Sequence, residues 1–285
     1  MKTSVSYIAL LASSVLFFIA CSNIEENERL RVVNVVEKDT VPEVPTPEEP
    51  ETDFFAETPR HILIEDYTGQ NCVNCPNATV LIEQLVKKYD SETIVPVGIH
   101  SGPLGISPAK DPKGLATDLG ETYYKHWGIE MQPMGIINRS DGALSTDWWT
   151  PKVSYDMDTP APSINIFVEA VRSDNSPHLD ISVTLAARDA VSGKLQLWLT
   201  EDSIVAPQKM LDGKTNLEYV HNHVLRCAVN GVWGEDISLT TGEKTTLTYA
   251  YEAEANWRTD QLAVVAFVYT DEAVLQVVRR KFGNH

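Results

Sequence analysis

The sequence has few basic residues, few cysteines and only one long apolar run among its 285 residues. Its 23 Lys and Arg are outnumbered by 40 Asp and Glu, which gives a formal net charge of -17. Binding of phosphate backbones needs clustered Lys and Arg, so this balance excludes nucleic acid as a partner and also excludes a polybasic membrane-binding surface. Beyond the first twenty residues no stretch approaches 18 apolar residues, so no further membrane-spanning helix is expected.

The apolar run lies at the N-terminus and reads as an export signal. Lys2 is followed by a mostly apolar stretch that ends in Phe18-Ile-Ala-Cys21. A small residue directly before a Cys resembles the lipobox of bacterial lipoproteins, although Phe18 stands where Leu is usual. The resemblance implies that residues 1–20 are removed and that Cys21 is the lipid attachment site, which carries acyl chains such as palmitate. The alternatives are an ordinary signal peptide with an incidental Cys and an uncleaved anchor.

An acidic, proline-rich segment follows. Residues 22–60 contain eleven Asp or Glu and four Lys or Arg. Its prolines disfavour a helix and stiffen the chain; they are Pro42, Pro45, Pro47, Pro50 and Pro59. We therefore predict that residues 21–59 form a lipid anchor and a solvated tether. Acidic residues soon after Cys21 also resemble a surface-export signal of Bacteroidetes.

Residues 60–158 follow a β/α pattern. Apolar runs predict strands at 61–67, 93–99, 134–138 and 143–144, and helical periodicity predicts helices at 76–89, 115–127 and 145–157. Pro76 fits the first turn of a helix, where its missing N–H has no partner to lose. The order β-α-β-α-β-β-α is that of a thioredoxin-like α/β domain.

Residues 159–285 contain strand patterns only. Apolar and polar residues alternate over 163–170, 178–187, 194–202, 245–254 and 261–270, and a last strand is expected at 273–280. Several short alternating strands without helices predict an all-β, immunoglobulin-like sandwich as a second domain. Pro160 and Pro162 mark the predicted boundary.

Cys72 and Cys75 form a Cys-x-x-Cys pair between a predicted strand and a predicted helix. The first Cys would lie at the helix N-terminus, where unpaired N–H groups and the helix dipole favour a thiolate. The second lies one turn on and can attack a mixed disulfide to release a bound partner. The pair therefore predicts a redox-active centre with its sulfurs within reach of solvent; a purely structural disulfide is the alternative.

Two further residues sharpen the resemblance to thioredoxin-like proteins. Asp66 lies six residues before Cys72, where thioredoxins carry a buried carboxylate that accepts a proton from the resolving Cys. Pro133 precedes the predicted strand 134–138, where thioredoxins place a cis-proline facing the disulfide. The resemblance implies catalytic roles for Cys72, Cys75, Asp66 and Pro133. The sequence departs from thioredoxin at Val73-Asn74, between the cysteines.

A closer resemblance extends over both predicted domains, from residue 60 to residue 282. The segments that carry it are Thr68-Gly69 with Cys72, Cys75 and Pro76, then Pro133–Asn138, Tyr219-Val-His-Asn-His223, Leu225-Arg226 and Gly231-Val-Trp-Gly234. Together they resemble the Bacteroidetes lipoprotein family named after a twenty-eight-kilodalton outer-membrane protein. The resemblance implies an outer-membrane location, with the domains facing out of the cell, and leaves the substrate open.

Other candidate sites have simpler interpretations. His221 and His223 would share one face of a strand, but no further ligand at metal-site spacing accompanies them, so we expect no metal. His100 ends a predicted strand near the expected ligand surface and is interpreted as a loop anchor; the alternative is that it helps to titrate the Cys-x-x-Cys pair. Cys227 is interpreted as a buried thiol. No Gly-rich phosphate loop or hydrolase motif is present, and no cofactor is predicted.

Two functions remain open from the sequence. In the first, the protein is a cell-envelope thiol–disulfide oxidoreductase acting on extended protein or peptide substrates. In the second, it is a surface-displayed binding or adhesion protein whose Cys72–Cys75 disulfide is only structural.

Overall fold

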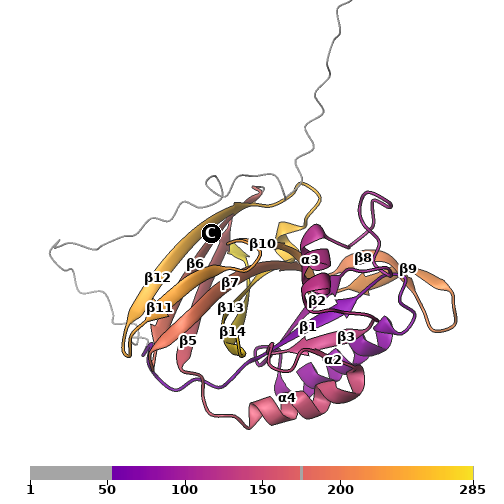
Figure 1. Cartoon of the computed structure of the whole chain (residues 1–285). Helices are drawn as coiled ribbons and strands as arrows, with labels where there is room; N and C mark the ends of the chain where they lie inside the picture. Colours follow the sequence, from indigo (N-terminus) through magenta and orange to yellow (C-terminus); the bar gives the residue numbers. More distant parts are fainter. Residues whose placement is uncertain (1–52, 174–175, 285) are drawn as a thin grey trace, which may run out of the picture.

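In the computed structural model, which describes residues 53–173 and 176–284, β-strands outnumber helices, and the helices gather at one end (Figure 1). The first part alternates strands and helices, as the sequence predicts. Its elements are β1 (Ile62–Thr68), α2 (Cys75–Tyr89), β2 (Ile94–His100), α3 (Asp118–His126), β3 (Met134–Ile137), β4 (Ala143–Leu144), a 3-10 turn at Thr146–Trp148 and α4 (Trp149–Met157).

The second part is built from strands and one short 3-10 turn. Its elements are β5 (Ile164–Arg172), β6 (His178–Ala187), β7 (Val191–Glu201), β8 (Ile204–Lys209), β9 (Thr215–His221), β10 (Val224–Ala228), β11 (Glu235–Leu239), β12 (Lys244–Glu252), the turn Thr259–Gln261, β13 (Leu262–Tyr269), β14 (Val274–Lys281) and β15 (Gly283–Asn284). The strands β8 to β11 lie where the sequence patterns predict none.

The two parts share one sheet. Among the described residues, nine strands join in the order β14-β13-β7-β10-β2-β1-β3-β4, with β11 added beside β7. The junction is the parallel contact of β10 with β2, where Val224 lies opposite Gly98 and the Gly98 N–H donates to the His223 carbonyl at 2.8 Å. The predicted boundary at residues 158 and 159 lies between α4 and β5, and strands from both sides of it join the nine-stranded sheet.

A second sheet covers part of the first. The strands β12-β6-β5-β15 form it, and one buried cluster packs apolar residues of β5 and β6 against β7 and β13. Alternation explains the packing: Leu179, Ile181, Val183 and Leu185 are buried at every second position of β6. The second part is thus two sheets around a shared core, and its immunoglobulin-like assignment stays a prediction.

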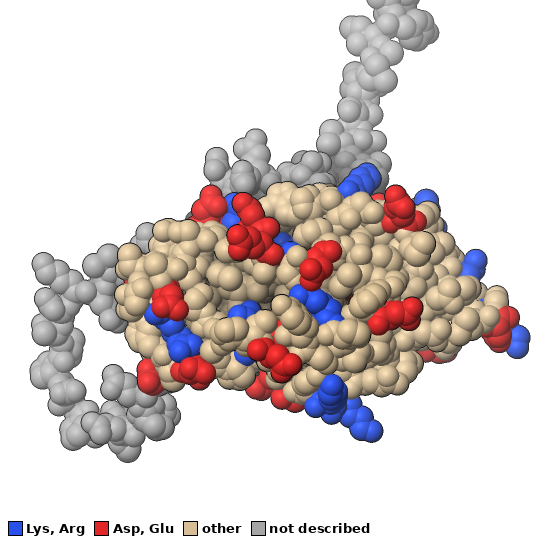
Figure 2. Space-filling view, turned by 60° about the horizontal axis from the view of Figure 1, so that its bottom comes forward, with Lys and Arg blue, Asp and Glu red and all other residues tan. Residues whose placement is uncertain are grey.

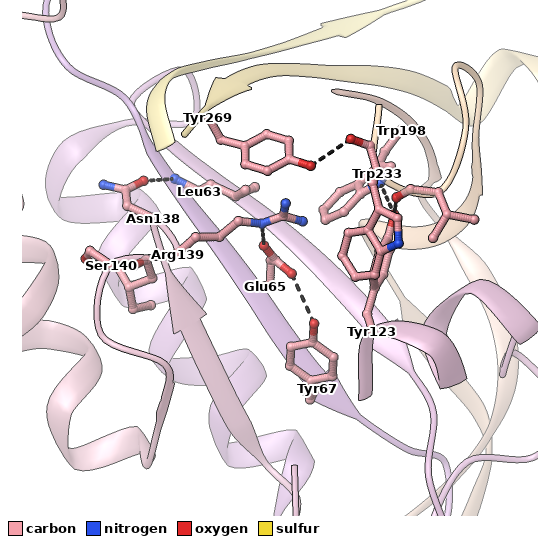
Figure 3. Close-up of polar contacts among 12 residues, drawn as sticks. Leu63, Glu65, Tyr67, Tyr123, Asn138, Arg139, Ser140, Trp198, Trp233 and Tyr269 are labelled. Atoms are coloured by element: carbon pink, nitrogen blue, oxygen red, sulfur yellow. Dashed lines mark hydrogen bonds and ion pairs between the residues drawn. The ribbon is translucent and has the colours of Figure 1, made fainter. Parts of the chain in front are cut away.

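The seam between the parts is aromatic and contains a buried ion pair. Trp198 and Phe267 of the second part pack with Leu63, Tyr67 and Tyr123 of the first. In their midst, Arg139 Nε donates to Glu65 Oε1 at 2.5 Å, and the two side chains are 4% and 0% exposed (Figure 3). The Tyr67 hydroxyl donates to the other Glu65 oxygen at 3.1 Å. These contacts join the strands on either side of the junction.

The end of the predicted tether packs against the fold. Asn165 of β5 donates through Nδ2 to the carbonyls of Phe54 and Ala56, and the Phe54 ring lies edge-on to Phe167 at 4.9 Å. Residues 53–59 are therefore part of the folded unit, because a buried Asn satisfies its donors on their backbone. The predicted signal, Cys21 and the remainder of the tether lie outside the described residues. No helix in the described ranges is both long and apolar enough to cross a bilayer.

Charges of both signs are mixed on the surface. On the face drawn in Figure 2, acidic and basic side chains are interspersed among uncharged residues. Individual ion pairs such as Lys152 with Asp141 and Lys194 with Asp236 fit this pattern. The described part thus offers no single-sign surface on that face.

Candidate functional site

The alternation of β1 divides its residues between two environments. Leu63, Glu65 and Tyr67 point to the aromatic seam, whereas Ile62 and Ile64 pack against α2. Asp66 lies on the α2 side by the same period of two. Asp66 pairs with Gly98 of β2 and Gly135 of β3. A side chain at Gly135 would collide with the Trp149 ring. One at Gly98 would lie 3.6 Å from the Asn222 carbonyl, so the two glycines let these neighbours pack closely on the sheet.

The Cys-x-x-Cys pair lies at the beginning of α2. Cys72 and Cys75 form a disulfide, with their Cα atoms 5.4 Å apart. The backbone N–H of Cys75, the first residue of the helix, donates to Cys72 Sγ at 3.1 Å. Pro76 follows in the first turn, as expected. A thiolate at Cys72 would therefore meet an N–H of the helix terminus, which favours the anionic sulfur.

Both cysteines are covered. Cys72 is 2% exposed and Cys75 is 3% exposed, so the expectation of sulfurs within reach of solvent is wrong for this conformation. The β8–β9 hairpin of the second part provides the cover. Gln208 of β8 donates through Nε2 to the Cys72 carbonyl at 2.8 Å, and the backbone N–H of Lys209 donates to the Gln70 carbonyl at 2.8 Å. The sequence patterns predict no strand at β8, so a cover over the disulfide was not expected.

A second buried glutamine ties the loop before Cys72 to its surroundings. Gln70, 2% exposed, donates through Nε2 to the carbonyls of Lys113 and Pro207 at 3.0 and 3.1 Å. Its Oε1 accepts the N–H of Leu115 at 2.9 Å. The side-chain amide has one acceptor and two donor hydrogens, and these bonds use both kinds. The loop is thereby held to the hairpin and to the segment before α3 at once.

Pro133 directly precedes β3, as the sequence predicts. The Gln132–Pro133 peptide bond is cis, and β3 begins at the next residue. Met134 of β3 pairs with Tyr67 of β1, so Pro133 lies beside the end of the strand that leads to Cys72. Gln132 Nε2 donates to the carbonyl of Ser101 at 3.0 Å and also contacts that of Thr68. The proline loop is thus fixed to the ends of both β1 and β2.

Asp66 and Cys75 line the same cavity, of about 270 Å³. Asp66 is 4% exposed, and among the described residues its Oδ1 has no hydrogen-bond partner. Burial raises the pKa of Asp66 to about 7, because desolvation disfavours the carboxylate. A carboxyl group that changes protonation near neutral pH, next to a disulfide, is suited to exchange protons with Cys75.

Two imidazoles lie in the same cavity. The rings of His100 and His221 meet edge to face, with centroids 5.1 Å apart. Burial lowers the pKa of His221 to about 4 and that of His100 well below its ordinary value, so both are neutral at pH 7. The predicted role of His100 as a loop anchor does not account for this position. The alternation of β2 could have revealed it, since Pro96, Gly98 and His100 share the Asp66 face.

The remaining sequence candidates lie elsewhere or carry no site. His223, half-buried, faces Asp202 and lies at the edge of the cavity. Cys227 is buried in the core between the two sheets. In the described part of the chain, no three His, Cys, Asp or Glu side chains are grouped as a metal site would require. The structure therefore brings Asp66, Cys75 and the two imidazoles together and leaves Cys227 apart.

Comparison with known proteins shows the family to which the chain belongs. No curated protein matches the chain. HBP35 of Porphyromonas gingivalis is 15% identical with a TM-score of 0.62, and the match covers 79% of this chain and 76% of that one. That likeness shows a shared fold. The model of the outer membrane protein Omp28 family matches residues 120–285, more than half of the chain. The chain belongs to the Omp28 family.

The Omp28 match begins inside α3 and runs through the whole second part. A domain of the outer membrane lipoprotein Omp28 from Porphyromonas gingivalis is also similar, at 28% identity and a TM-score of 0.31, over 45% of this chain and 94% of that one. Membership of the Omp28 family makes the chain an outer-membrane protein of the cell envelope. The resemblance read from the sequence is confirmed.

Proposed function

We propose that this Omp28-family protein is an envelope lipoprotein, anchored through Cys21, whose Cys72–Cys75 pair carries out thiol–disulfide exchange in a thioredoxin-like domain. The observation that carries the proposal is the arrangement around the disulfide. Cys75 begins a helix and lines one cavity with Asp66, whose pKa is about 7, and a cis-proline precedes the strand β3 that pairs with β1. The order β-α-β-α-β-β-α, with strands in the order β2-β1-β3-β4, supports the thioredoxin-like assignment.

The exchange starts from the oxidised pair that the structure holds. A substrate thiolate attacks Cys72 Sγ, the Cys72–Cys75 bond breaks, and Cys75 leaves as a thiolate that takes the proton of Asp66. A second substrate thiolate then attacks the substrate sulfur of the mixed disulfide and releases the Cys72 thiolate. The substrate loses two electrons and becomes a disulfide, and the cysteine pair gains them. The reverse sequence reduces a substrate disulfide.

The proposed exchange requires that a substrate reach Cys72, which is buried in the structure. Because the hairpin of β8 and β9 holds the Cys72 backbone through Gln208, exchange requires that the hairpin move away from the loop. As in thioredoxins, we expect the Pro133 loop to border the exposed sulfur. An extended peptide thiol fits such an opening, which lies between two backbone segments.

Reduction of insulin disulfides by the mature chain, with dithiothreitol as the electron donor, tests the proposal. We expect turnover above the rate of dithiothreitol alone, lost in Cys72→Ala and retained in Gln84→Ala, an exposed residue of α2 that lies outside the cavity. Turnover that survives Cys72→Ala unchanged would contradict the assignment.

Burial of both sulfurs favours a second candidate function, a surface-displayed binding or adhesion protein. In that case the disulfide is a structural link, and the second part, whose two sheets we propose to be immunoglobulin-like, presents the contact surface. Protease treatment of intact cells tests the location that adhesion needs. Domains that resist protease on intact cells, yet are cleaved after lysis, would face the periplasm and exclude adhesion.

A further inference from the structure

The cavity beside the disulfide is larger than proton exchange requires. One wall is α2, a second is the Asp66 face of β2, and a third is β9 with the residues after it. Its lining extends well beyond Cys75, along α2 as far as Lys87. Thiol–disulfide exchange uses Asp66 and Cys75 and leaves this extension without a role.

The inner end of the cavity holds three polar side chains with unused hydrogen-bonding atoms. Asp66, His100 and His221 are 4%, 4% and 6% exposed. Among the described residues, Asp66 Oδ1, His100 Nδ1 and His221 Nε2 form no hydrogen bond. Buried polar groups in folded proteins are nearly always satisfied, so three orphans that line one cavity point to a bound molecule.

The walls of the cavity are apolar and partly aromatic. Apart from the rings of His100 and His221, the Tyr219 ring lines it, and it lies edge-on to His221 at 4.8 Å. The aliphatic and proline side chains on the walls are Pro76, Ile82, Val86, Pro96 and Val220. A cavity of about 150 Å³ binds benzene. The 270 Å³ found here therefore admits a substituted aromatic ring, and the flanking rings favour edge-to-face contact with it.

The charged groups of the lining restrict the class of ligand further. The charged groups of the lining are Asp66 at the inner end and Glu83 and Lys87 on exposed positions of α2. An anion would meet the Asp66 carboxyl group in a buried setting. Each neutral imidazole presents one unpartnered ring nitrogen to the cavity, Nδ1 of His100 and Nε2 of His221, and the Asp66 carboxyl group presents Oδ1. Each of these atoms donates or accepts according to its tautomer or protonation, which matches a hydroxyl group that both donates and accepts.

We propose that this cavity binds a phenol ring, either on a free small molecule or as the tyrosine side chain of a peptide. The ring lies between α2 and β9, and its hydroxyl group hydrogen-bonds to His100, His221 and Asp66. The assignment goes beyond thiol–disulfide exchange and does not depend on it.

Titration of the full mature chain with p-cresol, followed by calorimetry and by two-dimensional NMR, tests the site. We expect saturable binding of one p-cresol per chain, with intermolecular contacts to the ring protons of Tyr219 and His221. Toluene lacks the hydroxyl group and p-toluate is an anion, so both should bind at least tenfold more weakly. Absence of saturable p-cresol binding, or equal affinity for toluene, overturns the proposal.

A matched pair of substitutions on α2 locates the site. Thr79 lines the cavity, whereas Gln84 is exposed on the same helix outside it. Thr79→Trp should fill the space and weaken p-cresol binding at least tenfold, and Gln84→Trp should leave the affinity unchanged. A folded Thr79→Trp variant that binds as well as the natural chain contradicts the site. The NMR contacts in the natural chain decide the question if that variant does not fold.

Two further experiments test whether the phenol belongs to a free molecule or to a peptide, and whether its binding depends on the redox-active cysteines. If N-acetyl-tyrosinamide binds as tightly as p-cresol, the natural ligand is a tyrosine side chain of a peptide. If it does not bind, the natural ligand is a free phenol. Cys72→Ala, at a residue that does not line the cavity, abolishes exchange but should retain p-cresol binding within threefold. If the natural chain reduces insulin but does not bind p-cresol, only the phenol site is contradicted. If it binds p-cresol but does not reduce insulin, only the proposed exchange is contradicted.

Discussion

Arg139 and Glu65 form an ion pair that is almost wholly removed from water. Their side chains are 4% and 0% exposed, and the guanidinium Cζ lies 4.6 Å from the ring centroid of Tyr269 and 4.9 Å from that of Phe267. Although burial opposes it, the Glu65 carboxylate raises the pKa of Arg139, so the guanidinium stays charged. The pair comes from the first part of the chain and the rings from the second, which makes their contact a joint between the two.

Arg139→Met should therefore be strongly destabilising. The substitution leaves the Glu65 carboxylate buried without its partner, which costs about 3–5 kcal/mol in comparable sites. Adding Glu65→Gln removes the stranded charge and should recover a large part of that loss. Urea unfolding of both variants measures the free energies. Equal stability of the single variant and the natural chain would show that the pair does not hold the seam.

Asp66 should make stability depend on pH. Its pKa is about 7 in the folded chain, above the ordinary value of 3.8, so folding favours the protonated form. That stabilisation is complete below pH 4 and is lost as the pH rises to 7. Asp66→Asn does not titrate, so its stability relative to the natural chain should increase from pH 4 to pH 8, by roughly 4 kcal/mol at most. Denaturant unfolding across this range measures the change; parallel pH profiles would contradict it.

Gln208 should control how fast the disulfide is reduced. Gln208→Ala removes the hydrogen bond to the Cys72 carbonyl, worth about 0.5–1.5 kcal/mol, and so favours the conformation in which the hairpin has moved away. We expect dithiothreitol to reduce the disulfide about threefold to tenfold faster in this variant. The rate is followed by trapping the thiols with an alkylating reagent, and Gln84→Ala on the exposed face of α2 is the control. An unchanged rate would mean that the hairpin does not limit access.

The Cys72–Cys75 disulfide should contribute modestly to stability. The loop that it closes is short, with a sequence separation of 3, so loop-closure entropy limits the gain to about 2 kcal/mol. Cys72→Ser/Cys75→Ser should lower the free energy of unfolding by about that amount and leave the far-ultraviolet circular dichroism unchanged. Unfolding of the variant at room temperature without denaturant would instead indicate that the disulfide is a major structural link.

The local pattern of the first part was readable from the sequence because each element carries its own signal. The helix that starts at Cys75 has Pro76 in its first turn, β1 begins with the apolar run Ile62–Ile64, and β2 is mostly apolar. Asp66 and Pro133 were singled out because the resemblance to thioredoxins implies a carboxylate and a cis-proline at these positions. In each case the information lies within a few residues of the element itself.

The cover over the disulfide was not readable from the sequence. The hairpin of β8 and β9 is poor in buried residues, and β9 is exposed at most positions, so it lacks the alternation that marks a strand. The hairpin is held over Cys72 by side-chain hydrogen bonds of Gln208 to Cys72 and of Gln70 to Pro207. The partners in each bond are more than a hundred residues apart in the sequence. Such contacts leave no periodic signal, and the shared sheet was missed for the same reason.

The uninterrupted sheet has a thermodynamic consequence. β2 pairs with β1 of the first part on one side and with β10 of the second part on the other. Unfolding of either part would therefore remove a paired strand from the other part. Heating should therefore give one endotherm in a calorimeter, with equal van't Hoff and calorimetric enthalpies. A gene fragment that stops at residue 158 would present the bare flank of β2 to other chains and would precipitate.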